Sequence, residues 1–135
     1  MRVLALMILG LMVVGCGTPA DNTFKASTHK ELTLEEKVVG TYEEKDIATE
    51  KWVFLANGIS EYYKDNKKTA EFKWTISKDG EIHIIDEGGG TEFLRINKDR
   101  FSGVLVSSIT SIAKIVEGKR TDYPKDKQIT FKKIK

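Results

Sequence analysis

The sequence predicts an all-β fold, and two observations point to it. Apolar and polar residues alternate from Ala70 to Ile76 and again from Glu81 to Ile85, a period that is typical of strands with one face in the core and one in water. Turn sequences such as Asn57-Gly58, Asp79-Gly80 and Glu117-Gly118 divide the chain into short segments. Short segments between such turns are typical of antiparallel strands.

The first residues resemble a bacterial lipoprotein signal peptide. Met1-Arg2 is followed by an apolar run from Val3 to Val14, and Val13-Val14-Gly15-Cys16 resembles a lipobox, whose cysteine is lipidated and becomes the first mature residue. The apolar run is shorter than the roughly 20 residues that a membrane-spanning helix needs. We therefore expect residues 1–15 to be a signal peptide and Cys16 to be a lipid anchor.

Residues 16–32 are predicted to be the lipidated cysteine and a flexible tether, because the stretch from Gly17 to Glu31 is polar and has neither helical nor strand periodicity. Residues 33–135 then form the β domain. The glycine after Cys16 resembles the outer-membrane sorting pattern of enteric bacteria. We expect a protein anchored to the cell envelope that faces the periplasm or the exterior, with the outer membrane favoured.

A short helical turn is predicted at the start of the β domain. Thr33 and Glu36 match a capping box, in which the threonine oxygen accepts from the amide three residues on and the glutamate reaches back. The turn is predicted to run from Leu34 to Val39 and to end at Gly40, whose missing Cβ permits a left-handed closing residue.

Nine candidate strands follow this turn. They lie at 41–46, 49–55, 59–64, 69–76, 81–85, 91–96, 100–106, 109–116 and 129–134. Short connections place neighbouring strands antiparallel, so the predicted topology is an up-and-down meander. Such a sheet hides its apolar face by closing into a small barrel or by packing as a sandwich. A barrel of about eight strands is filled by side chains or holds one small ligand.

The segment from Ser108 to Val116 fits two patterns. Ile109, Ile112 and Ile115 fit one face of a helix. The density of serine, threonine and isoleucine favours a strand instead, because β-branched residues lose rotamer freedom in a helix.

Three motifs, at Val39–Tyr42, at Phe54–Gly58 and at Phe72–Ile76, resemble those of small bacterial lipocalin-like lipoproteins. Val39-Gly40-Thr41-Tyr42 resembles the Gly-x-Trp opening of lipocalin-like domains, with tyrosine in the place of tryptophan. Phe54 to Gly58 resembles the F-x-x-D/N-G hairpin of that family, and Phe72 to Ile76 resembles its W-x-I strand. The likeness runs over roughly residues 33 to 106. It implies a small lipocalin-like barrel and suggests ligand binding.

Composition excludes several kinds of site and partner. Cys16 is the only cysteine, so the chain has neither an internal disulfide nor a cysteine-based zinc site or redox pair. The net charge is +2, and the loss of Arg2 with the signal leaves +1, which is no electrostatic footprint for nucleic acid. We expect a monomer without a cofactor.

The polar clusters do not combine into an active site. The only histidines are His29 and His83, and His83 with Glu81 on the same strand face is too few ligands for zinc. The hydroxyls between Ser107 and Ser111 lack a general base. Asp86 to Gly90 lacks the Gly-Lys-Ser/Thr ending of a phosphate loop and is interpreted as a hairpin turn. We therefore expect no metal, no catalytic residue and no enzymatic activity.

Five aromatic residues are candidates for lining a ligand site. They are Trp52, Phe54, Phe72, Trp74 and Phe101. If they line a cavity, the protein is a non-enzymatic binding module for a small apolar ligand. If they fill the core, it is a structural or interaction lipoprotein, or a periplasmic inhibitor, that contacts envelope proteins. The two hypotheses differ in whether the barrel interior has room for a ligand or is filled by side chains.

Overall fold

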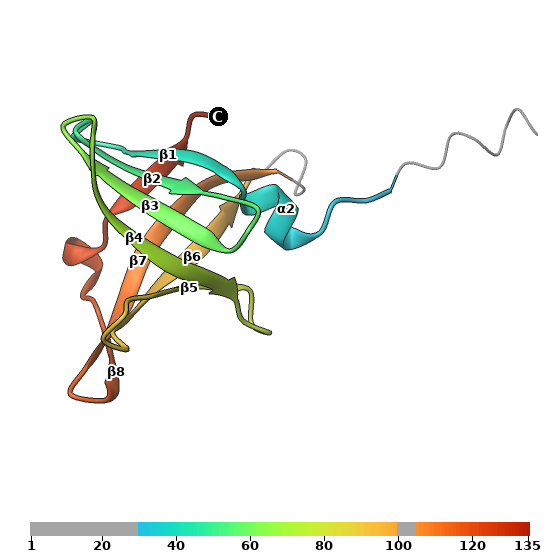
Figure 1. The fold of residues 1–135 in the computed structure, drawn as a ribbon. Coiled ribbons are helices and arrows are strands. Elements are labelled where there is room, and N and C mark those ends of the chain that lie inside the picture. The colour runs from blue at the N-terminus through green and yellow to red at the C-terminus, as the bar shows by residue number, and fades with distance from the viewer. Residues whose placement is uncertain (1–29, 100–104) are drawn as a thin grey trace, which may run out of the picture. The chain divides into compact units, whose positions relative to one another are not determined.

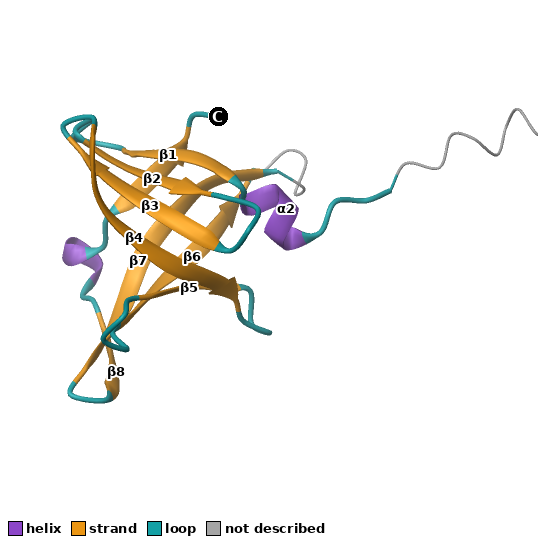
Figure 2. Cartoon of the chain, in the orientation of Figure 1, coloured by secondary structure: helices purple, strands orange, loops and turns teal. Residues whose placement is uncertain are grey.

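In the computed structural model, which describes residues 30–99 and 105–135, one short helix leads into nine strands (Figures 1 and 2). The elements are α2 (Leu34–Val38), β1 (Gly40–Glu44), β2 (Glu50–Phe54), β3 (Ile59–Lys64), β4 (Lys67–Ile76), β5 (Glu81–Ile85), β6 (Thr91–Lys98), β7 (Val106–Val116), β8 (Lys119–Asp122), a 3₁₀ turn (Lys125–Lys127) and β9 (Thr130–Lys133). The predictions for the signal peptide, for Cys16, for the tether up to residue 29 and for Phe101 lie outside the described residues.

Eight of these strands close into an antiparallel barrel (Figure 1). From β1 to β7, each strand pairs with its sequence neighbour. The barrel then closes through β9, which lies between β7 and β1. The predicted all-β meander is confirmed, and closure decides for a barrel over a sandwich. This architecture is compatible with a lipocalin-like fold.

The two last strands share one edge of β7, and the prediction missed the first of them. Ala113 lies opposite Asp122 in the β7–β8 ladder, whereas Thr110 lies opposite Thr130 in the β7–β9 ladder. From Ala113 back to Thr110 the position along β7 changes by three residues, whereas the paired position changes by eight, from Asp122 to Thr130. The extra residues form the 3₁₀ turn between β8 and β9. All four residues of β8 are exposed and polar. The segment therefore lacks the alternation of apolar and polar residues by which a strand is predicted from sequence.

The segment whose conformation the sequence left open is strand β7. It runs from Val106 to Val116 and pairs with β6 on one edge and with β8 and β9 on the other. A strand that is paired on both edges accommodates β-branched residues well, which explains why this segment, rich in isoleucine and valine, forms a strand and not a helix. Of the separate strand predicted at 100–106, residues 100–104 lie outside the described ranges, and Val106 belongs to β7.

The capping box at α2 is confirmed. The Thr33 hydroxyl accepts from the Glu36 amide at 3.2 Å, and the Glu36 carboxylate accepts from the Thr33 amide at 2.7 Å. The helix ends at Val38, one residue before its predicted end, and Val38 is fully buried. The Tyr42 hydroxyl donates to the Val38 carbonyl oxygen at 2.7 Å. In this way α2 covers one end of the barrel (Figure 1).

Gly40 connects α2 to β1 where the C-terminus approaches. Its φ of +146° is one that L side chains rarely adopt, and a Cβ there would collide with the Lys135 carbonyl oxygen. That oxygen accepts from the Thr41 amide at 2.9 Å. The Lys133 ammonium donates to the Lys37 carbonyl oxygen at 2.6 Å, so the last residues hold both the helix and the first strand.

Candidate ligand-binding site

The end of the barrel that α2 covers is filled by aromatic side chains. Phe54 is fully buried, and its ring meets the edges of Tyr42 at 5.5 Å and of Trp74 at 5.4 Å between centroids. The Trp74 indole donates to the Leu55 carbonyl oxygen at 3.0 Å. Together with Val38 these residues belong to one core cluster. At this end the rings of Tyr42, Phe54 and Trp74 therefore pack against one another.

A cavity of about 200 Å³, half open to solvent, lies at the opposite end. Its apolar surface comes from Trp52, Phe72 and Ile84, and its polar surface includes Glu92 of β6 and Tyr123, which follows β8. The Trp52 and Phe72 rings lie 5.6 Å apart between centroids. Because β2, β4, β5 and β6 supply these residues, the closed barrel is what brings them together.

The cavity reaches the side wall of the barrel beside β4. Only Lys73–Ile76 of β4 pairs with β5, so residues 67–72 of β4 have a strand partner in β3 alone. An outer groove of about 410 Å³ lies along this gap, and it shares Phe72 and Asp86 with the cavity. The cavity and the groove therefore share part of one wall, formed by Phe72 and Asp86.

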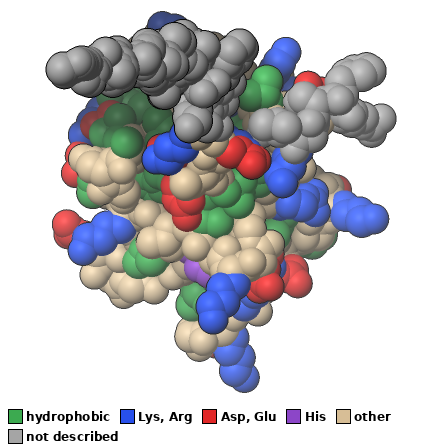
Figure 3. Space-filling model, turned by 90° about the vertical axis from the view of Figure 1, so that its right-hand side faces the viewer, with side chains coloured by type: hydrophobic (Ala, Val, Ile, Leu, Met, Phe, Trp, Pro, Cys, Tyr) green, Lys and Arg blue, Asp and Glu red, His purple; other side chains and the backbone are tan. Residues whose placement is uncertain are grey.

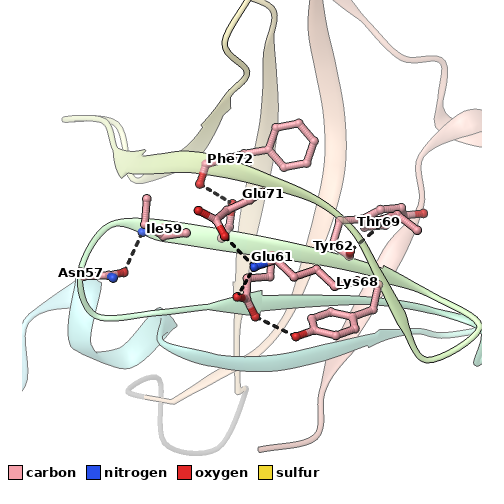
Figure 4. A network of polar contacts seen from close by, with 10 residues as sticks. Asn57, Ile59, Glu61, Tyr62, Lys68, Thr69, Glu71 and Phe72 are labelled. Atoms are coloured by element: carbon pink, nitrogen blue, oxygen red, sulfur yellow. Dashed lines mark hydrogen bonds and ion pairs between the residues drawn. The ribbon is translucent and has the colours of Figure 1, made fainter.

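The outer face of β3 and β4 carries a polar network (Figure 4). The Lys68 ammonium bridges the carboxylates of Glu61 at 2.7 Å and Glu71 at 2.6 Å, and the Tyr63 hydroxyl donates to Glu61 at 2.8 Å. The hydrogen bond from Lys68 holds the pKa of Glu61 below its usual value. Figure 4 shows the Phe72 ring pointing away from this network, which leaves it available to the interior.

Glu92 is, with Asp86, one of two acidic side chains that line the cavity. Its carboxylate accepts a short hydrogen bond from the hydroxyl of Ser111, which is buried. Burial, and secondarily the charge of Glu92, raises the pKa of Tyr123 above its usual value. Tyr123 is a neutral hydroxyl at neutral pH, as an ordinary tyrosine is, and the shift only moves its ionisation to higher pH.

Further carboxylates surround the Tyr62 hydroxyl, whose ring packs on Trp52 at 4.8 Å between centroids. Burial raises the pKa of Tyr62, and a hydrogen bond to Glu50 and the charges of Glu44 and Glu92 raise it further. The pKa of Glu44 is also raised, by burial and then by the charge of Glu50. Three carboxylates thus lie near the Tyr62 hydroxyl, and the Lys64 ammonium lies 3.8 Å from one of them, that of Glu50.

The predicted ligand-lining residues divide between this cavity and other places. Trp52 and Phe72 line the cavity, whereas Phe54 is part of the packed core. Trp74 lines a separate groove of about 300 Å³ beside α2. Apolar side chains gather in the middle of the face that carries α2, with charged ones around them (Figure 3). Phe101 lies outside the described residues.

The sequence prediction missed Ile84, Glu92, Lys114 and Tyr123, all of which line the cavity. The position of Glu92 could have been predicted, because Glu92, Leu94 and Ile96 share one strand face, and the other two residues are apolar. An acidic residue at an inward position is costly unless it is paired or functional. Tyr123 could not have been predicted in this way, since β8 itself has no alternation.

The polar clusters that the sequence singled out lie in different places: the pair of His83 and Glu81 is on the outer surface, Asp86 and Gly90 line the cavity, and Ser111 is buried beside Glu92. His83 packs edge-on against Phe93, with 4.6 Å between centroids, and lies 3.9 Å from Glu81. Glu81 is in turn held by Arg120 at 2.8 Å. Asp86 to Gly90 forms the predicted turn, in which the Gly90 amide donates to the Asp86 carboxylate at 2.7 Å. Within residues 30–99 and 105–135, no group of three acidic, histidine or cysteine residues is arranged to hold a metal ion.

Among the same described residues, no helix is long and apolar enough to span a membrane. Comparison of the chain with family models, with curated proteins and with solved structures finds no match.

Proposed function

We propose that the protein is a lipid-anchored, lipocalin-like lipoprotein of the cell envelope that binds a small apolar ligand without catalysing a reaction. One observation carries the binding proposal, namely the cavity of about 200 Å³ whose apolar wall is Trp52, Phe72 and Ile84. An apolar cavity of roughly 150 Å³ is large enough for benzene. Since the other end is packed with aromatic rings, the site suits a single-ring compound and not a long acyl chain.

The lipobox-like sequence Val13-Val14-Gly15-Cys16 and the apolar run before it support the anchor and the envelope location. The barrel supports the likeness to lipocalin-like lipoproteins that the motifs at Gly40, at Phe54 and at Trp74 suggest.

Titration of the full chain in detergent micelles with benzyl alcohol tests the binding proposal, with empty micelles as the blank. A ligand of this size is expected to bind with a dissociation constant on the order of 1 mM and to quench tryptophan emission in a saturable way. Trp52→Phe should remove most of the quenching, whereas Trp74→Phe, on the packed side of the core, should retain it. Dodecanol should show no saturable quenching above the blank. Non-saturable quenching by benzyl alcohol would refute a binding barrel.

A second candidate function is contact with another envelope protein, and one observation favours it. Residues 67–72 of β4 have a strand partner on one side only, and such an edge accepts an extended segment of a partner. A photo-crosslinking residue in place of Thr69 should then capture one discrete envelope protein in cells, and the same residue in place of Thr75, which pairs with β5, should not.

A further inference from the structure

We propose that the ligand carries a positive charge next to its apolar part, as a small aromatic or branched aliphatic ammonium compound does. The inference rests on the proposed function, because it concerns the ligand of the same cavity. The positive charge is inferred from the positions of Glu92 and Lys114 at the cavity and from the contacts of each side chain.

Glu92 is placed to receive an ammonium group. It lies on β6 opposite Ile84, which is part of the apolar wall, and it lines the cavity itself. The Ser111 hydroxyl donates to its carboxylate and keeps it aimed inward. A carboxylate has acceptor sites beyond the one that Ser111 uses. A ligand ammonium can therefore donate to Glu92 while its apolar part contacts Ile84.

The surroundings of Glu92 add to the attraction of a cation. Burial raises the pKa of Tyr62, and the carboxylates of Glu50, Glu44 and Glu92 raise it further. Glu50 also lies 3.8 Å from the Lys64 ammonium, so Glu92 carries most of the attraction that we propose. Trp52 and Phe72 supply aromatic side chains at the same cavity, and aromatic rings attract cations. An anionic ligand would meet the carboxylate of Glu92 instead.

Lys114 is the cationic side chain among the cavity residues, and it lies farther out than Glu92. Lys114 is exposed, whereas Glu92 is partly buried. The Lys114 ammonium is 5.8 Å from the centroid of the Tyr123 ring. Lys114 lies opposite Glu92 in the β6–β7 ladder, and solvent screens exposed charges more strongly than partly buried ones. The carboxylate of Glu92 is therefore the charge that we expect to act more strongly on a ligand in the cavity.

Three probes of one shape test this inference on the full chain in micelles, namely benzylamine, benzyl alcohol and benzoate at pH 7. Benzylamine should bind about tenfold more tightly than benzyl alcohol, since it adds a charge-assisted hydrogen bond and a cation–π contact. Benzoate should bind more weakly than either. Glu92→Gln, which retains an acceptor for Ser111, should bring the dissociation constants of benzylamine and benzyl alcohol to within twofold of each other.

The matched control is Glu61→Gln, which removes the same charge from the outer face and should leave the tenfold preference unchanged. Equal affinity of the wild-type protein for benzylamine and benzyl alcohol would overturn the charge inference and leave the proposed function intact. Binding of none of the three probes would overturn both. A benzylamine preference that survives in Glu92→Gln would overturn the role of Glu92.

Discussion

At the scale of single residues, Tyr42 connects the barrel to its helix. Its ring is fully buried against Phe54, and its hydroxyl donates to the last carbonyl of α2, that of Val38. Burial raises the pKa of Tyr42 well above its usual value. The neutral form is therefore the one that the fold requires, and ionisation of the phenol opposes folding.

Replacement of Tyr42 by phenylalanine tests this role. The Val38 carbonyl oxygen loses its side-chain donor, so Tyr42→Phe should lower the free energy of unfolding by about 1–2 kcal/mol at pH 7. The raised pKa means that the contribution of Tyr42 is complete below pH 10, the usual value of a tyrosine, and falls as the pH rises above it. Denaturant unfolding from pH 8 to 11 should show a shallower alkaline loss in Tyr42→Phe. An unchanged slope would contradict this account.

At the scale of elements, β8 depends on one arginine. Its four residues pair with β7 alone and are exposed. The Arg120 guanidinium donates twice to the Glu81 carboxylate of β5, at 2.8 and 3.1 Å, and lies 4.7 Å from the centroid of the Phe93 ring. Phe93 is thereby covered on the outer face of the barrel, where it is 8% exposed. These contacts hold β8 to β5, which lies three positions away in the sheet.

Removal of the Glu81 charge should release β8 without unfolding the barrel. An exposed ion pair contributes about 0–1 kcal/mol to stability, so Glu81→Gln should change global unfolding little and speed hydrogen exchange of the amides in residues 119–122. Hydrogen bonds from Arg120 hold the pKa of Glu81 below its usual 4.5, so the contact is complete above pH 4.5 and is lost as the pH falls below it. The control is Glu61→Gln, which removes a carboxylate from β3, a strand that does not pair with β8. Equal exchange of β8 in both variants would refute the role of Arg120.

At the scale of the whole molecule, attachment to the membrane is predicted to depend on Cys16. Anchoring by two or more acyl chains at one cysteine is stable, since each buried methylene contributes about 0.8 kcal/mol. Cys16→Ser should therefore accumulate as the unprocessed precursor and incorporate no acyl label in growing cells. Acylation of the Cys16→Ser protein, detected by labelled palmitate, would contradict the assignment of the anchor.

The sequence by itself determined the fold class and most of the elements. The capping box of Thr33 and Glu36, the alternation from Ala70 to Ile76 and the turn at Asp79-Gly80 each depend on residues a few positions apart. Local chemistry therefore sufficed to predict them. The same reasoning failed at Lys119–Asp122, because that strand is specified by its partner β7 and not by its own pattern.

Only the tertiary structure decided that the sheet closes, and which aromatic residues remain beside open space. Trp52, Ile84 and Tyr123 meet at one cavity from three distant parts of the chain, whereas Phe54, two residues after Trp52, is packed in the core. The difference follows from strand register and from the position of α2 over one end of the barrel. Both are set by pairing between residues far apart in sequence, which no local pattern encodes.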